Sequence, residues 1–283
     1  MNVSFWTKVF LTAFFILQFD PSVSWAAKKI TKKKIPAATA AISAKSAILS
    51  DVTRGKRLYG KNVHRRVMPA STTKVMTALL VLEDLSLDQI VTVGKNALNT
   101  SPSKIDIQAG ESFTVRDLMY AILLNSANDA AIALAEAVSG SEKSFVEKMN
   151  RRAYELGAHN TKFANCHGLP SAPAIQYTTA FDMLLIFREA LKYDFFRQAI
   201  AVPYKTISSQ QGRQISLKNH NKLLFSNWGK DIRGKTGYTR AAGACFIGYL
   251  TQGKRTFVIG VFGCRHRWED IRLIFNRYGA MSL

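Results

Sequence analysis

Residues 241–262, which read AAGACFIGYLTQGKRTFVIGVF, contain two strand-like runs and the turn that joins them. Ala241–Leu250 and Thr256–Phe262 are mostly apolar, and the polar segment Thr251-Gln252-Gly253-Lys254 between them carries the glycine typical of a tight turn. The pattern predicts a β-hairpin close to the C-terminal end of the chain.

A second hairpin is predicted near the other end, from Ala47–Asp51 and Arg57–Tyr59 with Arg54-Gly55 between them. Helical patterns fill most of the region between the two hairpins. Strands at both ends with helices between them predict an α+β domain whose sheet joins N- and C-terminal segments. Further strands are expected at Tyr204–Ser208 and Gln214–Lys218, and helices at Ser71–Leu85, from Thr114, Ser144 and Thr179, and at Trp268–Tyr278.

The composition is that of a folded and strongly basic protein. Of 283 residues, 47% are hydrophobic, and 39 Lys and Arg against 19 Asp and Glu give a formal net charge of +20. Three cysteines cannot build a disulfide framework, so packing must supply most of the stability. These numbers exclude a disordered chain and a disulfide-stapled scaffold.

The N-terminal region has the pattern of an export signal. The apolar run Val9–Phe19 follows Lys8, is short for a membrane span and precedes small residues near Ala26. We therefore expect a signal peptide over residues 1–26, with an uncleaved anchor as the alternative, a basic linker over 27–40 and one folded domain over 41–283. The protein would then be exported, to the periplasm or to the outer face of the cytoplasmic membrane.

The basic charge bears on the choice of partners. An exported basic protein meets anionic membrane or envelope polymer, and a nucleic-acid partner would leave the signal peptide unexplained. The run KKITKKK at residues 28–34 is interpreted first as a solvated linker, and contact of this tail with an anionic membrane or envelope surface stays open.

Ser71 and Lys74 stand three residues apart at the predicted first turn of an apolar helix. Residues at this spacing share a helix face, so a hydroxyl and an amine can meet there. The unpaired N–H groups of a helix N-terminus favour an oxyanion beside such a serine, which suits an acyl-transfer nucleophile. The spacing alone is weakly specific, because Ser101-Pro102-Ser103-Lys104 repeats it in a polar loop, and we interpret that copy as background.

Two further triplets strengthen the prediction of acyl transfer. Ser126-Ala127-Asn128 interrupts two apolar runs, so its polar side chains are expected at a helix end, and Lys235-Thr236-Gly237 opens the C-terminal strand region. S-x-x-K followed by an S-x-N triplet and K-T-G is the ordered pattern of penicillin-binding proteins and class A β-lactamases.

With these motifs the chain resembles the low-molecular-weight penicillin-binding proteins, the serine D-alanyl-D-alanine carboxypeptidases. The likeness runs from about Ala41 to Leu283. It implies the penicillin-binding protein and serine β-lactamase-like transpeptidase fold, an antiparallel sheet flanked by helices, with 41–283 as the catalytic D,D-peptidase domain. The segments that carry it are Lys61-Asn62, PASTTKVMT at 69–77, LLNSANDA at 123–130, Glu155–Pro170 and GKTGYTRAAG at 234–243.

The resemblance implies a catalytic role for three of these residues. Ser71 would be acylated by the penultimate D-alanine of a peptidoglycan stem peptide, Lys74 would act as the general base, and Ser126 would pass a proton to the leaving amine. β-Lactams would acylate Ser71 and act as covalent inhibitors. We expect the charge of Lys235, together with partial burial, to lower the pKa of Lys74 so that it can serve as a base.

The remaining motif residues would bind the substrate. The resemblance implies that Asn128 holds the substrate amide and the catalytic lysine. It also implies that Lys235 and Thr236 of the Lys235-Thr236-Gly237 triplet bind the terminal carboxylate, and that the backbone N–H groups of Ser71 and Tyr238 form the oxyanion hole. An arginine after the last strand also assists carboxylate binding in this family. Arg265 and Arg267 both fit that description, and the choice between them stays open.

Several alternatives remain at this point. The short stretch after Gly237 leaves room for one hairpin and one helix, so we expect neither the additional β domain nor the C-terminal amphipathic helix of many relatives. Shortened relatives include D,D-endopeptidases that cut crosslinks. A β-lactamase would need a further carboxylate to activate water, and an inactive envelope-binding protein would have little reason to keep the motifs together.

No metal or cofactor is predicted, because the five histidines lack the spacing of a ligand set. His167, beside Cys166, is expected to make a hydrogen bond within its loop. Cys245 and Cys264 lie on the two strands of the C-terminal hairpin and are expected to be free thiols.

Overall fold

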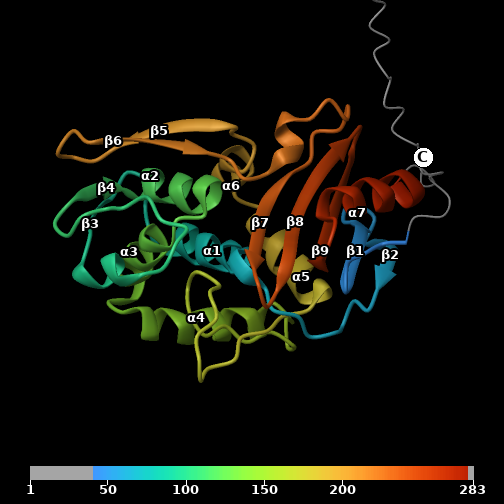
Figure 1. Cartoon of the computed structure of the whole chain (residues 1–283), viewed down its shortest axis with the longest axis horizontal. Helices are drawn as coiled ribbons and strands as arrows, with labels where there is room; N and C mark the ends of the chain where they lie inside the picture. Colours follow the sequence, from blue (N-terminus) through green and yellow to red (C-terminus); the bar gives the residue numbers. More distant parts are fainter. Residues whose placement is uncertain (1–40, 280–283) are drawn as a thin grey trace, which may run out of the picture. The chain divides into compact units, whose positions relative to one another are not determined.

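The structure is a computed structural model that describes residues 41–279, and its centre is a five-stranded antiparallel sheet in the order β2-β1-β9-β8-β7 (Figure 1). Strand β1 pairs on one side with β2 and on the other with β9, so the sheet joins N- and C-terminal segments as predicted. The strands are β1 (Ser46–Asp51), β2 (Lys56–Lys61), β7 (Arg233–Thr239), β8 (Gly243–Gln252) and β9 (Arg255–Cys264).

The β8–β9 hairpin has a tighter turn than we expected. Gln252 pairs with Arg255 and Thr251 with Thr256, so only Gly253 and Lys254 remain in the loop. Two-residue loops match the right-handed twist of antiparallel strands, and the ladder therefore continues through the residues that we assigned to the turn.

The two faces of the sheet pack against different helices. Along β9, Val258 and Phe262 join the larger hydrophobic core, whereas Ile259 and Val261 join a smaller one with Ile271 of helix α7 (Arg267–Ile274). This alternation follows from the two-residue period of a strand. The helices are α1 (Lys74–Asp84), α2 (Val115–Tyr120), α3 (Asn128–Ser139), α4 (Glu142–Glu155), α5 (Ala180–Ala190), α6 (Asp194–Ala199) and α7 (Arg267–Ile274).

The helical lobe, made of α1 to α4, lies beside β7 (Figure 1). Two helix starts predicted from sequence are confirmed, since Thr114 and Thr179 accept hydrogen bonds from the backbone N–H groups of Asp117 and Asp182. The predicted start at Ser144 is wrong. The side chain of Ser141 accepts from the Ser144 N–H, so the helix begins three residues earlier.

Residues 41–279 also contain two small two-stranded sheets. Strands β5 (Tyr204–Ser208) and β6 (Gln214–Lys218) pair only with each other, as do β3 (Ile90–Thr92) and β4 (Ser112–Thr114). The β5–β6 hairpin stands over α2 (Figure 1), and the chain returns from it to the central sheet through residues 219–232. Those residues form one wall of the site.

Within residues 41–279, no helix combines the length and the apolar character that crossing a bilayer requires. The signal peptide and the basic linker that we expect over residues 1–40 lie outside the described part of the chain.

Candidate active site

Ser71 lies in a single 3-10 turn, Ala70–Thr73, that leads directly into α1. The turn is held from two sides. A Cβ atom on Gly237 of β7 would come within 2.9 Å of the Ser71 backbone nitrogen, and a Cβ on Gly168 would lie 2.0 Å from the Ala70 carbonyl oxygen. Ala70 itself has φ of 48°, a left-handed value that is costly for a side-chain-bearing residue. Close packing therefore fixes the backbone of Ser71 against the edge strand of the sheet.

Lys74 is completely buried, and its Nζ has three oxygen neighbours. It donates to Asn128 Oδ1 at 2.5 Å and to the His167 carbonyl oxygen at 2.8 Å, and it lies 3.5 Å from Ser71 Oγ. A neutral amine has two N–H donors and one lone pair. With both donors taken by carbonyl oxygens, the lone pair of the neutral form faces the Ser71 hydroxyl.

The surroundings of Lys74 make the neutral form accessible. Burial lowers the pKa of Lys74 to about 7, while smaller contributions from Cys166 and Asp129 oppose the shift. Our expectation of partial burial was wrong, because Lys74 is completely buried and burial is the main cause of its low pKa. Lys74 and Lys235 also repel each other, and the pKa of Lys235 is held well below its ordinary value by burial and then by Lys74 and Arg267.

Ser126 ends a short π-helical turn (Ala121–Asn125) in a left-handed conformation, with φ of 60°. Its hydroxyl is buried and has no hydrogen-bond partner among the described residues. A buried hydroxyl without a partner is costly, so a partner supplied by a bound molecule would be favourable. Ser126 is thus placed at a helix end, as its sequence context predicted.

Asn128 begins α3 and is held by the loop that carries the second S-x-x-K copy. Its backbone N–H donates to the Ser103 carbonyl and its Nδ2 to the Ser101 carbonyl, both at 2.8 Å. Lys104 forms an ion pair with Asp106 instead of approaching a serine. The copy does not form a second Ser–Lys pair, but its loop positions Asn128.

The Lys235-Thr236-Gly237 triplet lies on β7, the strand that borders the helical lobe. Lys235 is buried and donates to the Thr236 carbonyl at 3.0 Å, and Thr236 lines the cavity in front of Ser71. The side chain of Tyr238 also lines this cavity and is 69% exposed. The residues of the predicted motifs therefore meet at one place, although they come from three separate segments of the chain.

Arg267, at the start of α7, belongs to the site, whereas Arg265 does not line it. One guanidinium nitrogen of Arg267 donates to the carbonyls of Gly237 and Cys245, at 3.0 and 2.8 Å. Its Nε is buried without a partner among the described residues. Arg265 lines a different depression, together with His266. The structure thus separates two arginines that the sequence left equivalent.

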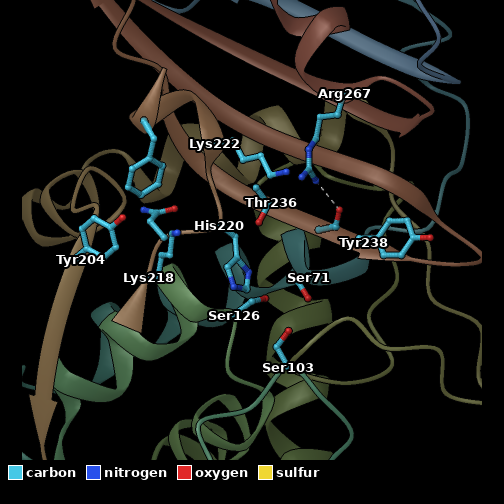
Figure 2. A pocket seen from close by; sticks show the side chains of 13 residues that line it. Ser71, Ser103, Ser126, Tyr204, Lys218, His220, Lys222, Thr236, Tyr238 and Arg267 are labelled. Atoms are coloured by element: carbon cyan, nitrogen blue, oxygen red, sulfur yellow. Dashed lines mark hydrogen bonds between the residues drawn. The ribbon is translucent and has the colours of Figure 1, made fainter. Parts of the chain in front are cut away.

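The cavity has a volume of about 730 Å³ and extends well beyond these motif residues (Figure 2). Among the described residues, no Asp or Glu lines it. Sequence reasoning missed the contributions of Ser103, Lys218 and Lys222. They are exposed residues in a loop, at the end of β6 and at the start of a short 3-10 helix, and carry no local signal. The remaining lining residues that we did not anticipate are Tyr204, Asn219, His220 and Phe225.

His220 lies beside Ser126 in the cavity (Figure 2). Partial burial, and then the charges of Lys235, Arg267 and Lys74, lower the pKa of His220 to about 4. The imidazole is therefore neutral near pH 7. The segment around it is fixed, because Asn221 Nδ2 donates to the Ile232 carbonyl at 2.7 Å.

Within residues 41–279, no group of three or more His, Cys, Asp or Glu side chains is arranged to hold a metal ion. His167 Nδ1 accepts a hydrogen bond from the Leu169 N–H, which confirms its predicted role within the loop. The cysteines, including Cys245 and Cys264, are free and buried.

Comparisons with known proteins agree with this geometry. A family model described as D-alanyl-D-alanine carboxypeptidase matches residues 31–265. The D-alanyl-D-alanine carboxypeptidase DacF of Bacillus subtilis is 37% identical over 225 residues, which cover 78% of this chain but only 57% of the relative. DacB2 of Mycobacterium tuberculosis, with the same description, is 35% identical over 235 residues, which cover 81% of this chain and 80% of the relative.

Solved structures show the same likeness in three dimensions. The crystal structure of the Streptomyces K15 DD-transpeptidase matches with a TM-score of 0.78 at 31% identity, covering 85% of this chain and 98% of the other. The similarity therefore includes the central sheet and the helical lobe between which the cavity lies.

Proposed function

The chain belongs to the D-alanyl-D-alanine carboxypeptidase family, and from this premise we propose that it is a serine D,D-carboxypeptidase that removes the terminal D-alanine from peptidoglycan stem peptides. The substrate class is part of the proposal, because the chain spans only 57% of the length of the Bacillus relative. The motif residues take the roles that the resemblance implies.

In the acylation step, Ser71 Oγ attacks the carbonyl carbon of the penultimate D-alanine while its proton moves to the neutral amine of Lys74. The backbone N–H groups of Ser71 and Tyr238 stabilise the oxyanion. The C–N bond then breaks, and the leaving amine receives a proton through Ser126, which Lys74 in turn reprotonates. The products of this step are an ester on Ser71 and free D-alanine.

Deacylation reverses these roles. Lys74 takes a proton from water, the hydroxide adds to the ester carbonyl, and Ser71 leaves with that proton. Asn128 holds the amide of the acyl group, and Lys235, Thr236 and Arg267 bind the terminal carboxylate of the incoming peptide. Lys235 is buried and forms no ion pair within residues 41–279, so the substrate carboxylate would supply a counter-charge and favour the charged form of that lysine.

The observation that carries the proposal is the arrangement around Lys74 Nζ. Two carbonyl oxygens occupy both N–H donors of the neutral amine, Ser71 Oγ faces the third position, and the pKa of Lys74 is about 7. A general base is most effective when its pKa lies near the working pH. Burying a lysine costs free energy of folding, and an inactive envelope-binding protein would gain nothing in return.

The lining of the cavity argues against a β-lactamase. Rapid hydrolysis of a penicilloyl ester by such enzymes uses an additional carboxylate to activate water. None of the residues 41–279 that line the cavity is acidic. We therefore infer that β-lactams acylate Ser71 and remain attached, so that they inhibit the protein.

Intact mass spectrometry after incubation with benzylpenicillin tests the proposal. We expect a stoichiometric adduct on Ser71 that persists for many turnovers of a pentapeptide ending in D-Ala-D-Ala, and release of D-alanine from that peptide. Ser71→Ala should abolish both. Ser101→Ala, the first serine of the second S-x-x-K copy, is the matched control and should retain both. An adduct that survives Ser71→Ala, or rapid release of penicilloate by the wild type, would refute the assignment.

We further propose that the protein is exported, with residues 1–26 as the signal peptide, 27–40 as a basic linker and 41–283 as the catalytic domain. The charge of KKITKKK supports contact of this linker with anionic membrane. N-terminal sequencing of the secreted protein from a bacterial host tests the cleavage site. Cosedimentation with phosphatidylglycerol vesicles, for chains with and without residues 27–40, tests the contact.

A further inference from the structure

Asp129 is a buried carboxylate that the proposed mechanism does not use. It is the second residue of α3, directly after Asn128, and is 1% exposed. A buried charge is costly unless a counter-charge or hydrogen bonds compensate it. Within residues 41–279, no lysine or arginine forms an ion pair with Asp129. Hydrogen bonds must therefore compensate the charge, and they identify the segment that Asp129 holds.

Outside its own helix, Asp129 receives hydrogen bonds from two backbone N–H groups of one loop. The Ile105 N–H lies 3.0 Å from Oδ2 and 3.2 Å from Oδ1, and the Ile107 N–H donates to Oδ2 at 3.2 Å. Asp106, between the two donors, has a left-handed φ of 53°. A turn of this kind aims neighbouring N–H groups toward one side and makes a concavity that binds anions. Asp129 fills such a concavity in its own chain.

The other contacts of this turn are less directional. The left-handed backbone of Asp106 is costly for a residue with a side chain. Ile105 and Ile107 are buried and attach the turn to the core, but apolar contacts do not fix the direction of backbone groups. Arg213 donates to the Asp106 carbonyl at 3.3 Å, at the exposed surface. The carboxylate of Asp129 therefore sets the orientation of the turn.

The same loop sets the orientation of the Asn128 side chain. The Ser101 carbonyl accepts from Asn128 Nδ2, and the Ser103 carbonyl accepts from the Asn128 backbone N–H, both at 2.8 Å. A side-chain amide has a donor end and an acceptor end. With Nδ2 on the Ser101 carbonyl, Oδ1 faces Lys74 Nζ at 2.5 Å. A displaced loop would free the amide to turn its NH2 group toward the amine.

The segment between the turn and the site is short. Ser103 lines the cavity and lies near Ser71 and Ser126 (Figure 2). Only Lys104 separates Ser103 from Ile105, whose N–H group Asp129 holds. A shift of the turn is therefore transmitted directly to the carbonyl groups that hold Asn128.

We propose that Asp129 is a positioning residue of the reaction. By binding the N–H groups of Ile105 and Ile107, it holds the 101–107 loop so that Asn128 presents its oxygen to Lys74. The inference rests on the proposed role of Lys74 as the general base, and it adds a residue that touches neither the substrate nor the reacting atoms. The effect of Asp129 on the reaction must then pass through Asn128.

A double-mutant cycle tests this route. Asp129→Asn keeps the shape of the side chain but leaves one acceptor oxygen where the loop uses two. Above about pH 8, where Lys74 is mostly neutral, we expect benzylpenicillin to acylate this variant about tenfold more slowly than the wild type, as for residues of one hydrogen-bond network. In the Asn128→Ala background, the same substitution should slow acylation less than about twofold. Intact mass spectra taken over hours resolve the slow rates.

Asp182→Asn is the matched control. Asp182 is also buried in the first turn of a helix, and it accepts from the Asn160 N–H and from the hydroxyls of Thr161 and Thr179, each at 2.8 Å. Among the described residues, it has no hydrogen bond to the 101–107 loop. This variant should lose stability in urea, while its acylation rate stays within about twofold of the parent in both Asn128 backgrounds.

Three results would overturn the positioning role of Asp129: an unchanged acylation rate in Asp129→Asn, equal slowing in both Asn128 backgrounds, or an equal loss in Asp182→Asn. Should circular dichroism show that Asp129→Asn does not fold, Asp129→Glu replaces it with the same expected coupling, because it moves the acceptor oxygens by one methylene. If the wild type forms no penicillin adduct, the proposed function fails. If the adduct forms and the cycle is additive, only the positioning role fails.

Discussion

Lys74 Nζ donates to Asn128 Oδ1 at 2.5 Å, although the two residues belong to separate helices and lie 54 positions apart in the chain. This contact, with the one to the His167 carbonyl, orients the amine so that its third position faces Ser71. It links two of the three sequence motifs directly. The chemistry of the site therefore depends on how α1 and α3 pack, and the following predictions test that dependence.

The pH dependence of acylation should follow Lys74. Because the base must be neutral and the pKa of Lys74 is about 7, the rate constant for acylation by benzylpenicillin should rise from pH 5.5 through 7 and level off above about pH 8. Stopped-flow or quenched-flow mass spectrometry of the wild type measures it. A rate that falls over this range would show that a protonated group limits the reaction.

The stability of the protein should also depend on Lys74. The unfolded chain keeps the ordinary pKa near 10.5, so between pH 7 and 10 the unfolded state binds more protons and the folded state gains stability as the pH rises. The Lys74→Met variant has no titratable group at this position, so its stability lacks this dependence on pH. The free energy of unfolding of the wild type, relative to Lys74→Met, should increase by up to about 1.4 kcal/mol per pH unit over this window. Urea denaturation at pH 7, 8 and 9 measures the slope, and a constant difference would contradict the low pKa.

Ser126 should act through its hydroxyl and not through its backbone. Ser126→Ala and Ser126→Gly both remove the hydroxyl, but glycine accepts the φ of 60° without strain. We expect both variants to lose about a hundredfold in kcat on the pentapeptide, as for a missing proton donor, while the glycine variant is more stable by about 1 kcal/mol. If the more stable glycine variant were also clearly more active than the alanine variant, Ser126 would instead have a structural role.

Substitutions of Arg267 and of Arg265 should have very different effects on substrate binding. Arg267→Gln removes a guanidinium that lies in the cavity, and we expect KM for the pentapeptide to rise about tenfold or more, with less effect on a substrate whose C-terminus is amidated. Arg265→Gln removes an exposed side chain outside the cavity and should change neither value. Equal effects of the two substitutions on KM would show that only long-range charge matters.

Gly168 should be needed for close packing beside Ser71. Gly168 and Gly157 both have positive φ, of 93° and 80°, but only at Gly168 would a Cβ meet backbone, 2.0 Å from the Ala70 oxygen. Gly157→Ala should cost about 1 kcal/mol of unfolding free energy from strain alone. Gly168→Ala should cost clearly more and slow penicillin acylation as well. Denaturation midpoints and adduct formation rates measure both, and equal costs would argue against the packing role.

The elements of the fold were largely predictable because their signals are local. The hairpins at Ala47–Tyr59 and Ala241–Phe262 follow from runs of apolar residues around short turns, and the caps Thr114 and Thr179 from residues three positions apart. The start of α4 was misplaced because Ser141 and Ser144 both suit a cap, and only the fold decides which one caps the helix.

The sequence by itself determined the nature of the site, since the hydroxyl and amine of Ser71 and Lys74 and the two triplets are chemical groups encoded in order along the chain. Only the tertiary structure decided that Arg267 and not Arg265 faces the cavity, that the Ser101–Ser103 loop holds Asn128, and that burial gives Lys74 its low pKa. The physical reason is that desolvation and hydrogen bonding depend on every neighbour in space, and most neighbours of a buried group come from distant parts of the chain.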